Sequence, residues 1–309
     1  TRPVFWLHTK CLPDYLERSL DLISEIFTSL NLEDRSRIRE IVGREFAWAD
    51  HSAQSEGFNL PATRVFAHLS TAGAYNESYG GVTAYRAIKD LALNYDKQEE
   101  DFIENLVQIA SLLFNRQNML LSITAEQNEI DQLAKIGSCL PDALSSAVLS
   151  SYSPPELNLA DHEAFITSAE VVFAVQGGNI LENGEGYNGH FEVLKTYLSR
   201  DYLWNSVRQM GGAYGCFIQF SLISGNLAFI SYRDPQVKKT YDAYNAVPEV
   251  IANLDIPEKV LEQLIIGTYG NFDPLQSPAA KGAAARNEYL NGIDSQYKQQ
   301  RLKEITTTS

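Results

Sequence analysis

The chain has 309 residues, of which 44% are hydrophobic and 21% are charged. These are the values of ordinary globular proteins, so we expect folded domains with sizeable cores. The formal net charge of −14 argues against a nucleic-acid-binding protein, because such proteins neutralise phosphates with Lys and Arg. It also argues against docking on anionic membranes, and no window approaches the roughly 18 apolar residues of a membrane helix.

The cysteines and the chain ends indicate the cellular location of the protein and whether the sequence is a piece of a longer one. Cys11, Cys139 and Cys216 are far apart and odd in number, so a disulfide framework or a zinc ribbon is not expected. A reducing compartment fits, and we predict a cytoplasmic protein, or an organellar one in a eukaryote. The first residues lack the pattern of a signal peptide. Neither end reads as a natural terminus, so we expect a piece of a longer protein.

Hydrophobic periodicity predicts both strands and helices in residues 1–150. We expect strands at residues 3–10 and 118–124. Apolar residues at helical spacing predict helices over residues 13–30, 32–58, 62–69, 85–93, 99–113 and 126–144. At residues 150–155, two prolines among small polar residues stop any regular element. We place the boundary between two domains, residues 1–150 and 151–309, in this stretch.

The second part repeats the order of strands followed by helices. We expect strands at 170–176, 216–223 and 227–232, with Ser224-Gly-Asn226 forming a tight hairpin turn between the last two. Helices are predicted at residues 190–209, 236–252, 257–269, 279–290 and 294–305. The predicted fold class is therefore α+β, with helices packed on one face of a sheet in each domain.

Gly184-Glu-Gly-Tyr-Asn-Gly189 matches the G-x-G-x-x-G pattern of dinucleotide-binding proteins. However, several residues separate it from the preceding strand, and the later strands form a hairpin where that fold has a parallel crossover. We therefore favour a flexible loop that leads into a helix over a nucleotide site.

Motifs of common catalytic sites are missing from the sequence. The five histidines are scattered, and no H-x-x-E-H, G-x-S-x-G or P-loop pattern occurs. The densest cluster, Asp161-His162-Glu163, fits a solvated loop better than a metal site. The sequence thus predicts no metal or cofactor site within this chain.

The stretch from Arg208 to Gly215 (R-Q-M-G-G-A-Y-G) is the most suggestive local feature. A long helix ends at Arg208, two glycines interrupt it, and Tyr214 leads into a strand. Taken alone, this pattern favours a helix C-cap with a packed Tyr and a surface Arg. The alternative is that the guanidinium and the phenol hold a peptide carbonyl or carboxylate.

Residues 202–215 (Y-L-W-N-S-V-R-Q-M-G-G-A-Y-G), followed by F-I-S-Y-R-D-P at 229–235, resemble the C-terminal half of presequence proteases. These enzymes are pitrilysin (insulinase) metallopeptidases. Residues 79–90, 114–124 and 279–292 resemble other motifs of the same half, so the similarity covers nearly the whole chain.

The resemblance implies a protein of two halves, each made of two related α+β domains, that close over a peptide chamber. Residues 1–150 would be the third domain and residues 151–309 the fourth, truncated at both ends. The N-terminal half of the same polypeptide would hold zinc through H-x-x-E-H. It would be the partner of this chain, and unstructured peptides the substrates.

The resemblance also implies roles for two residues. Tyr214 would donate a hydrogen bond to the substrate near the scissile bond and stabilise the oxyanion, and Arg208 would hold the substrate backbone or a carboxylate. The fragment alone would be inactive. The alternative is a catalytically inactive peptide-binding or scaffold subunit in which both residues survive.

Overall fold

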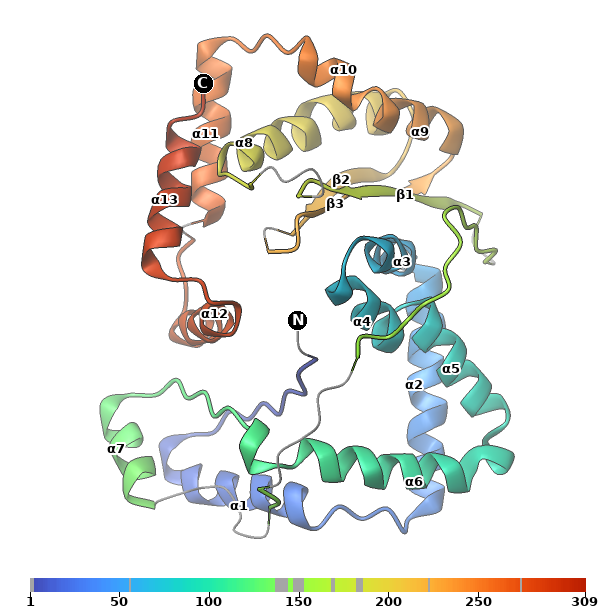
Figure 1. Ribbon diagram of the computed structural model, residues 1–309, viewed down its shortest axis with the longest axis vertical. Helices are drawn as coiled ribbons and strands as arrows, with labels where there is room; N and C mark the ends of the chain where they lie inside the picture. The colour runs from blue at the N-terminus through green and yellow to red at the C-terminus, as the bar shows by residue number, and fades with distance from the viewer. Residues whose placement is uncertain are drawn as a thin grey trace.

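The computed structural model describes residues 3–55, 57–136, 144–146, 153–167, 170–181, 186–221, 223–272 and 274–309. These residues form helices and one three-stranded antiparallel sheet, which lies in the upper half of the view in Figure 1. The predicted α+β class is confirmed. No helix in the described part of the chain is long and apolar enough to cross a bilayer.

The regular elements in the described part of residues 1–150 are helices. Its elements are η1 (Pro13–Tyr15), α1 (Leu16–Thr28), α2 (Arg35–Ser55), α3 (Asn59–Leu69), α4 (Thr71–Gly80), α5 (Val82–Leu93), α6 (Tyr95–Leu113), the 3-10 turn η2 (Arg116–Asn118) and α7 (Gln127–Ile136). Sequence periodicity did not predict α4, which begins after Ser70, whose hydroxyl accepts a hydrogen bond from the Gly73 N–H. This helix has no apolar stripe that a periodicity argument could detect.

The strands predicted at residues 3–10 and 118–124 do not form. Both segments are irregular or, at Asn118, the end of a 3-10 turn. Their apolar side chains remain in solvent, for example Phe5 at 58% and Leu121 at 57% exposure. A strand needs a neighbouring strand to accept and donate its backbone hydrogen bonds. No such neighbour exists here within the described residues, so a sheet in the first domain is not confirmed.

The sheet lies in the second part and has the order β1–β3–β2. Its strands are β1 (Val172–Asn179), β2 (Gly215–Phe220) and β3 (Asn226–Asp234). The predicted hairpin between β2 and β3 is confirmed, and Gly225 supplies its left-handed residue with φ +71°. Such a φ suits glycine because it has no Cβ.

Both faces of the sheet are covered by helices, which corrects the prediction of helices on one face only. On one face, Ala228 and Ile230 of β3 are fully buried against α3 with Ala62. On the other, Cys216 of β2 packs into a core with Leu203. Figure 1 shows α3 and α8 on opposite sides of the sheet. Because α3 is far away in sequence, local periodicity carried no signal for this packing.

Helices complete the second part. They are α8 (His190–Tyr197), the π-helical segments η3 (Leu198–Tyr202) and η4 (Trp204–Gln209), α9 (Val237–Asn245), α10 (Val247–Ala252), α11 (Glu258–Phe272), α12 (Pro278–Asn291) and α13 (Ser295–Thr306). An ion pair joins α13 to α8, in which Arg301 Nη2 donates to Glu192 Oε1 over 3.1 Å. Glu192 also accepts from Lys195 Nζ at 2.9 Å, so this buried carboxylate is paired twice.

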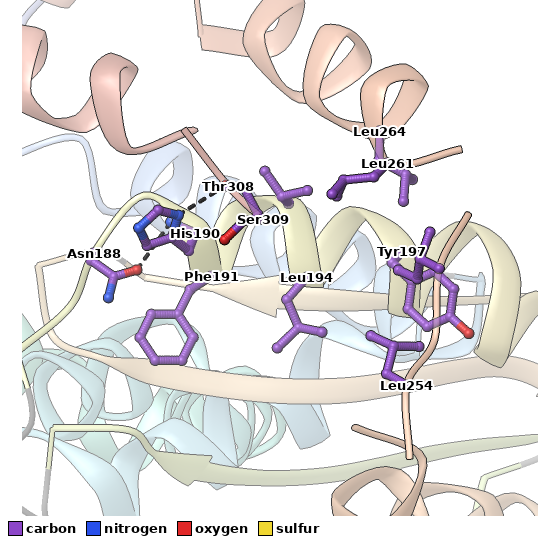
Figure 2. Close-up of a pocket in the computed structure, with 12 residues that line it drawn as sticks. Asn188, His190, Phe191, Leu194, Tyr197, Leu254, Leu261, Leu264, Thr308 and Ser309 are labelled. Atoms are coloured by element: carbon purple, nitrogen blue, oxygen red, sulfur yellow. Dashed lines mark hydrogen bonds between the residues drawn. The ribbon is translucent and has the colours of Figure 1, made fainter. Parts of the chain in front are cut away.

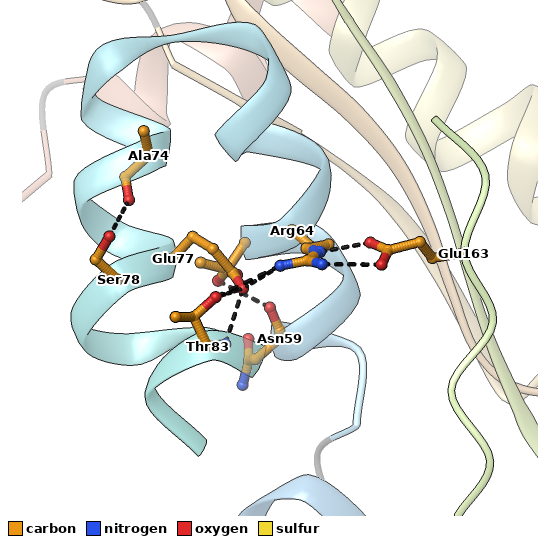
Figure 3. Close-up of polar contacts among 8 residues, drawn as sticks. Asn59, Arg64, Ala74, Glu77, Ser78, Thr83 and Glu163 are labelled. Atoms are coloured by element: carbon orange, nitrogen blue, oxygen red, sulfur yellow. Dashed lines mark hydrogen bonds and ion pairs between the residues drawn. The ribbon is translucent and has the colours of Figure 1, made fainter. Parts of the chain in front are cut away.

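A buried arginine connects α3 with α4 and with the segment that follows the predicted linker (Figure 3). Arg64 Nη1 donates to Glu77 Oε1 over 2.8 Å, and its Nε and Nη2 donate to both carboxylate oxygens of Glu163. Glu77 is completely buried and also accepts from the Thr83 N–H and hydroxyl, both at 2.9 Å. A Cβ at Gly81 would lie 1.9 Å from Glu77 Oε2, so this packing requires glycine there.

This network adds a partner that the sequence did not predict. Glu163 lies in an exposed irregular segment, as expected for a solvated loop, but its side chain is 21% exposed and accepts two hydrogen bonds from Arg64. Asp161 and His162 are exposed, as expected. Residues 150–152 of the proposed domain boundary at 150–155 lie outside the described residues, and the boundary stays a prediction.

Candidate functional site

Arg208 lies near the end of one continuous helix that runs from α8 through the two π-helical segments. The Leu203 N–H bonds to the Leu198 carbonyl, and the Met210 N–H to the Asn205 carbonyl over 2.9 Å. These are i to i−5 bonds, which characterise π turns and recur near functional sites. The predicted helix is thus confirmed in extent, and its second half is π-helical.

Two glycines shape the connection from this helix to β2. Gly212 has φ +83° and donates to the Arg208 carbonyl over 2.9 Å, which confirms the predicted helix C-cap. Gly215 lies opposite Tyr232, and a Cβ there would come within 2.2 Å of the tyrosine ring. The first glycine is therefore required by backbone conformation and the second by the ring across the ladder.

Between these glycines, Tyr214 is held by its ring and leaves its hydroxyl in solvent. The ring packs edge-on against Tyr232 with centroids 5.4 Å apart, and the Tyr214 N–H donates to the Arg233 carbonyl over 3.3 Å. The residue is 59% exposed. Its hydroxyl has no hydrogen-bond partner among the described residues. A phenol fixed in this way can donate to an external acceptor without first breaking an internal bond.

Arg208 is half-buried, and its guanidinium lies over the Trp204 ring, 3.8 Å from the centroid. This is a cation–π contact, and no carboxylate in the described part of the chain pairs with it. Its positive charge acts on Cys216, which belongs to the core between the sheet and the π-helical segments. Burial dominates there and raises the pKa of the Cys216 thiol to about 11.

Arg208 and Tyr214 flank the start of β2. The Tyr214 ring is next to Tyr232, whose ring packs on the α3 side with Phe58, whereas Arg208 is next to the core under the π-helical segments. The structure records no contact between the two side chains.

Tyr214 forms part of the wall of an aromatic hollow that sequence reasoning did not predict. The hollow has a volume of about 470 Å³ and is lined by Ser55, Phe58, Tyr214, Phe217, Tyr232 and Arg233. The Phe58 ring meets the Phe217 ring edge-on with centroids 5.5 Å apart. Residues far apart in the sequence thus form one surface, and no local pattern could have linked them.

Arg233 has the one left-handed backbone conformation of a non-glycine residue in the described chain, with φ +51°. Its neighbour Asp234 is completely buried. Asp234 Oδ2 accepts from Ser231 Oγ at 2.7 Å and from Thr240 Oγ1 at 2.6 Å, and its Oδ1 accepts from the Gln236 N–H at 2.8 Å. The chain folds back to place this carboxylate at the start of α9. The Arg233 side chain then remains exposed beside Tyr214, 5.6 Å from its ring centroid.

The turn at the aspartate was detectable in the sequence, because an Asp side chain commonly accepts from the backbone N–H two residues on, as Asp234 does from Gln236. The position of Arg233 was not. That position depends on the left-handed turn and on Tyr214, which lies beside Arg233 only because β2 pairs with β3.

A second hollow of about 360 Å³ lies between α8, α11 and the last residues of the chain (Figure 2). Leucines such as Leu194, Leu261 and Leu264 line it, and its polar end has His190 Nδ1 3.0 Å from Thr308 Oγ1. None of the side chains that line it is an Asp, Glu, Lys or Arg. Its lining is mostly apolar, with His190, Asn188 and Tyr197 among its polar side chains.

The structure does not support a dinucleotide site near Gly184–Gly189. Gly184 itself lies outside the described residues. The strands before and after this segment, β1 and β2, are not hydrogen-bonded neighbours, because each pairs antiparallel with β3, which lies between them. The adjacent parallel strands of a dinucleotide fold are therefore missing from the described sheet. Among the residues that the structure describes, no group of three or more His, Cys, Asp or Glu side chains could hold a metal ion.

Comparisons with known proteins agree with this picture. Residues 162–309 match the family described as "PreP C-terminal domain", and residues 1–91 match a family of segments associated with peptidases of family M16, subfamily C. "Protein HypA" of Clostridium perfringens is 28% identical over 98% of this chain and 31% of its own length. "Presequence protease 1, chloroplastic/mitochondrial" of Arabidopsis thaliana is 29% identical over 94% of this chain and 27% of its own length. A mitochondrial presequence protease of Kluyveromyces lactis is 29% identical over 60% of this chain and 20% of its own length.

The chain belongs to the presequence-protease type of the M16 peptidases and corresponds to a C-terminal part of such a protein. It spans less than a third of the length of these curated relatives.

Proposed function

We propose that this chain is the non-zinc half of a zinc metalloendopeptidase that degrades unstructured peptides. It would comprise the third and fourth domains of the parent, divided near residue 150, and would close over a peptide chamber formed with the N-terminal catalytic half. The zinc would be held by that other half, so the parent would be the enzyme. A reducing location, cytoplasmic or organellar, follows from the same proposal.

In this function, Tyr214 is the group of this chain nearest to the chemistry. Its hydroxyl would donate to the substrate oxygen that gains negative charge next to the scissile bond. Arg208, on the other side of the start of β2, would hold the peptide backbone or a carboxylate through its fork of N–H donors. Together they would fix one stretch of peptide at two points.

The observation that carries the proposal is the state of Tyr214. Its ring is packed against Tyr232 and its backbone is bonded to Arg233, yet the residue is 59% exposed. A tyrosine with only a packing role gains more free energy when its ring is buried. A fixed and exposed phenol is better explained by a ligand that arrives from outside.

Separating the two halves tests this function. We expect the purified 309-residue chain to cleave no peptide with any metal, and cleavage to return when a zinc-bearing N-terminal half is added. Turnover of a quenched fluorescent peptide is the measurement. Metal-dependent cleavage by the purified chain alone would contradict the proposal.

The second candidate is a peptide-binding or scaffold subunit that has lost catalysis. It is favoured by the half-buried, stacked state of Arg208, which suits steady binding as well as catalysis. A parent polypeptide that binds peptides, but neither binds zinc nor cleaves them, would support this candidate against the first.

A further inference from the structure

We propose that the aromatic hollow beside Tyr214 is a side-chain pocket that selects a bulky apolar residue followed by a carboxylate in the bound peptide. This inference rests on the proposed function, because it assumes that a peptide reaches Tyr214. It adds a substrate class and assigns roles to Ser55, Phe58, Phe217 and Arg233.

The walls of the hollow determine the apolar part of the ligand. The rings of Phe58, Phe217 and Tyr232 meet edge to face or tilted, with centroids 5.5 to 6.5 Å apart. A volume of about 470 Å³ has room for one large side chain. Aromatic and branched aliphatic side chains gain most from leaving water in such a pocket.

The rim determines the charged part. Arg233 lines the hollow and is exposed, and no described carboxylate pairs with it. The Arg233 guanidinium lies over the Tyr214 ring, and this contact positions the guanidinium before any ligand binds. A carboxylate on the residue next to the buried side chain would meet two parallel N–H donors.

The backbone gives independent support for a role of the Arg233 side chain. An L-residue with φ +51° is in a conformation that glycine adopts with less strain. Asp234 and its three bonds impose the turn, but they do not require an arginine at the preceding position. Strained residues whose surroundings fix them are frequent at ligand sites.

The pocket also continues the proposed peptide site, because Tyr214 belongs to both. A peptide held by the Tyr214 hydroxyl would pass the rim of the hollow. The occupant is therefore the same extended peptide, and no separate partner is needed.

Binding of four short serine–glycine peptides to the intact parent polypeptide tests the pocket. Each is labelled with fluorescein and carries one central pair: Phe-Asp, Ala-Asp, Phe-Asn or Ala-Asn. Affinity is measured by fluorescence anisotropy in the presence of a chelator, so that no peptide is cleaved. We expect the Phe-Asp peptide to bind about tenfold more tightly than either singly changed peptide.

Variants of Ser55 test the apolar part of the pocket and variants of Arg233 test its charged rim, and none of them changes an aromatic residue of its walls. Ser55→Trp fills the hollow from its exposed rim, with Ser55→Ala as the matched control, and should remove the preference for Phe over Ala. Arg233→Gly suits the left-handed backbone, so the protein should unfold at the same or a higher temperature. It should lose the preference for Asp over Asn, and Arg233→Lys should keep part of it.

The proposed pocket would be refuted if Ser55→Trp kept the preference for Phe over Ala, or if Arg233→Gly kept the preference for Asp over Asn. Equal binding of all four peptides by the unmodified protein would also refute it. Failure of the pocket is distinguishable from failure of the proposed function. The proposed function fails when Tyr214→Phe leaves turnover unchanged, and that is a rate measurement independent of the four affinities.

Discussion

The direction of the Tyr214 side chain depends on the residues on each side of it. Gly212 ends the helix in a left-handed conformation, and Gly215 leaves room for the Tyr232 ring that supports Tyr214. The resemblance to presequence proteases selected Tyr214 and Arg208 as candidates, whereas the motif alone favoured a helix C-cap. The motif could not predict Arg233 or Phe58, because both reach the hollow through contacts between segments far apart in the chain.

Gly215→Ala should destabilise the protein by about 1–3 kcal/mol, because its methyl group would overlap the Tyr232 ring and force that ring to move. The free energy of unfolding in urea measures the effect. The matched control is Gly178→Ala in β1, where a Cβ meets nothing within 4 Å. Equal stability of the two variants would refute the packing role assigned to Gly215.

Cys216 should resist alkylation in the folded protein. Its pKa is raised to about 11 by burial, so at pH 8 only about one thiol in a thousand is the reactive thiolate. Iodoacetamide labelling followed by peptide mass spectrometry measures this, with the exposed Cys11 as the internal control. Raising the pH toward 11 should accelerate labelling of Cys216. Native-state labelling at the rate of Cys11 would show that burial does not protect this thiol.

At the scale of elements, the helix that ends at Arg208 shows a limit of periodicity arguments. A 3.6-residue period predicted its extent well. Two of its buried apolar positions, Leu198 and Leu203, are however five residues apart, because a π turn inserts an extra residue between them. Phe191 and Leu194 of the predicted stripe are only partly buried. Hydrogen bonds of the i to i−5 type have no clear signature in one sequence.

The β3–α9 junction depends on one carboxylate. Asp234→Asn should cost about 2 kcal/mol or more, since an amide cannot accept from Ser231, Thr240 and the Gln236 N–H together. Urea unfolding measures the loss. Asp242→Asn, at an exposed position of α9, is the control and should change stability little. A loss at position 234 no larger than that of the control would remove the basis for the turn at Arg233.

At the scale of the whole molecule, the two sequence-defined parts share one core. Helix α3 from the first part covers a face of the sheet in the second, and Arg64 of α3 pairs with Glu163 beyond the predicted linker. Fold class, the hairpin and most helices were predictable, because these depend on local pattern. The packing of α3 on the sheet of the second part was not predictable, because it depends on contacts between distant segments.

The Arg64–Glu163 pair should make stability depend on pH. The hydrogen bonds that Arg64 donates to the Glu163 carboxylate hold the pKa of Glu163 below its ordinary value. The pair's contribution is therefore complete above the ordinary carboxyl range, about pH 4, and is lost as the pH falls through the lowered folded-state value. Glu163→Gln should cost about 2 kcal/mol at neutral pH, and this difference from the unmodified protein should shrink in acid.

Urea unfolding across this pH range measures the difference. Asp161→Asn, an exposed acid two residues away, is the control. A difference between Glu163→Gln and the unmodified protein that stays constant down to about pH 2 would show that the ion pair does not stabilise the fold.

The most direct test of the central claim is Tyr214→Phe in the intact parent polypeptide. This change keeps the ring against Tyr232 and removes only the free hydroxyl. We predict that kcat for peptide cleavage falls roughly 100-fold, while the peptide affinity measured without cleavage stays within about twofold. An unchanged kcat would contradict the assignment of Tyr214 to the reacting bond.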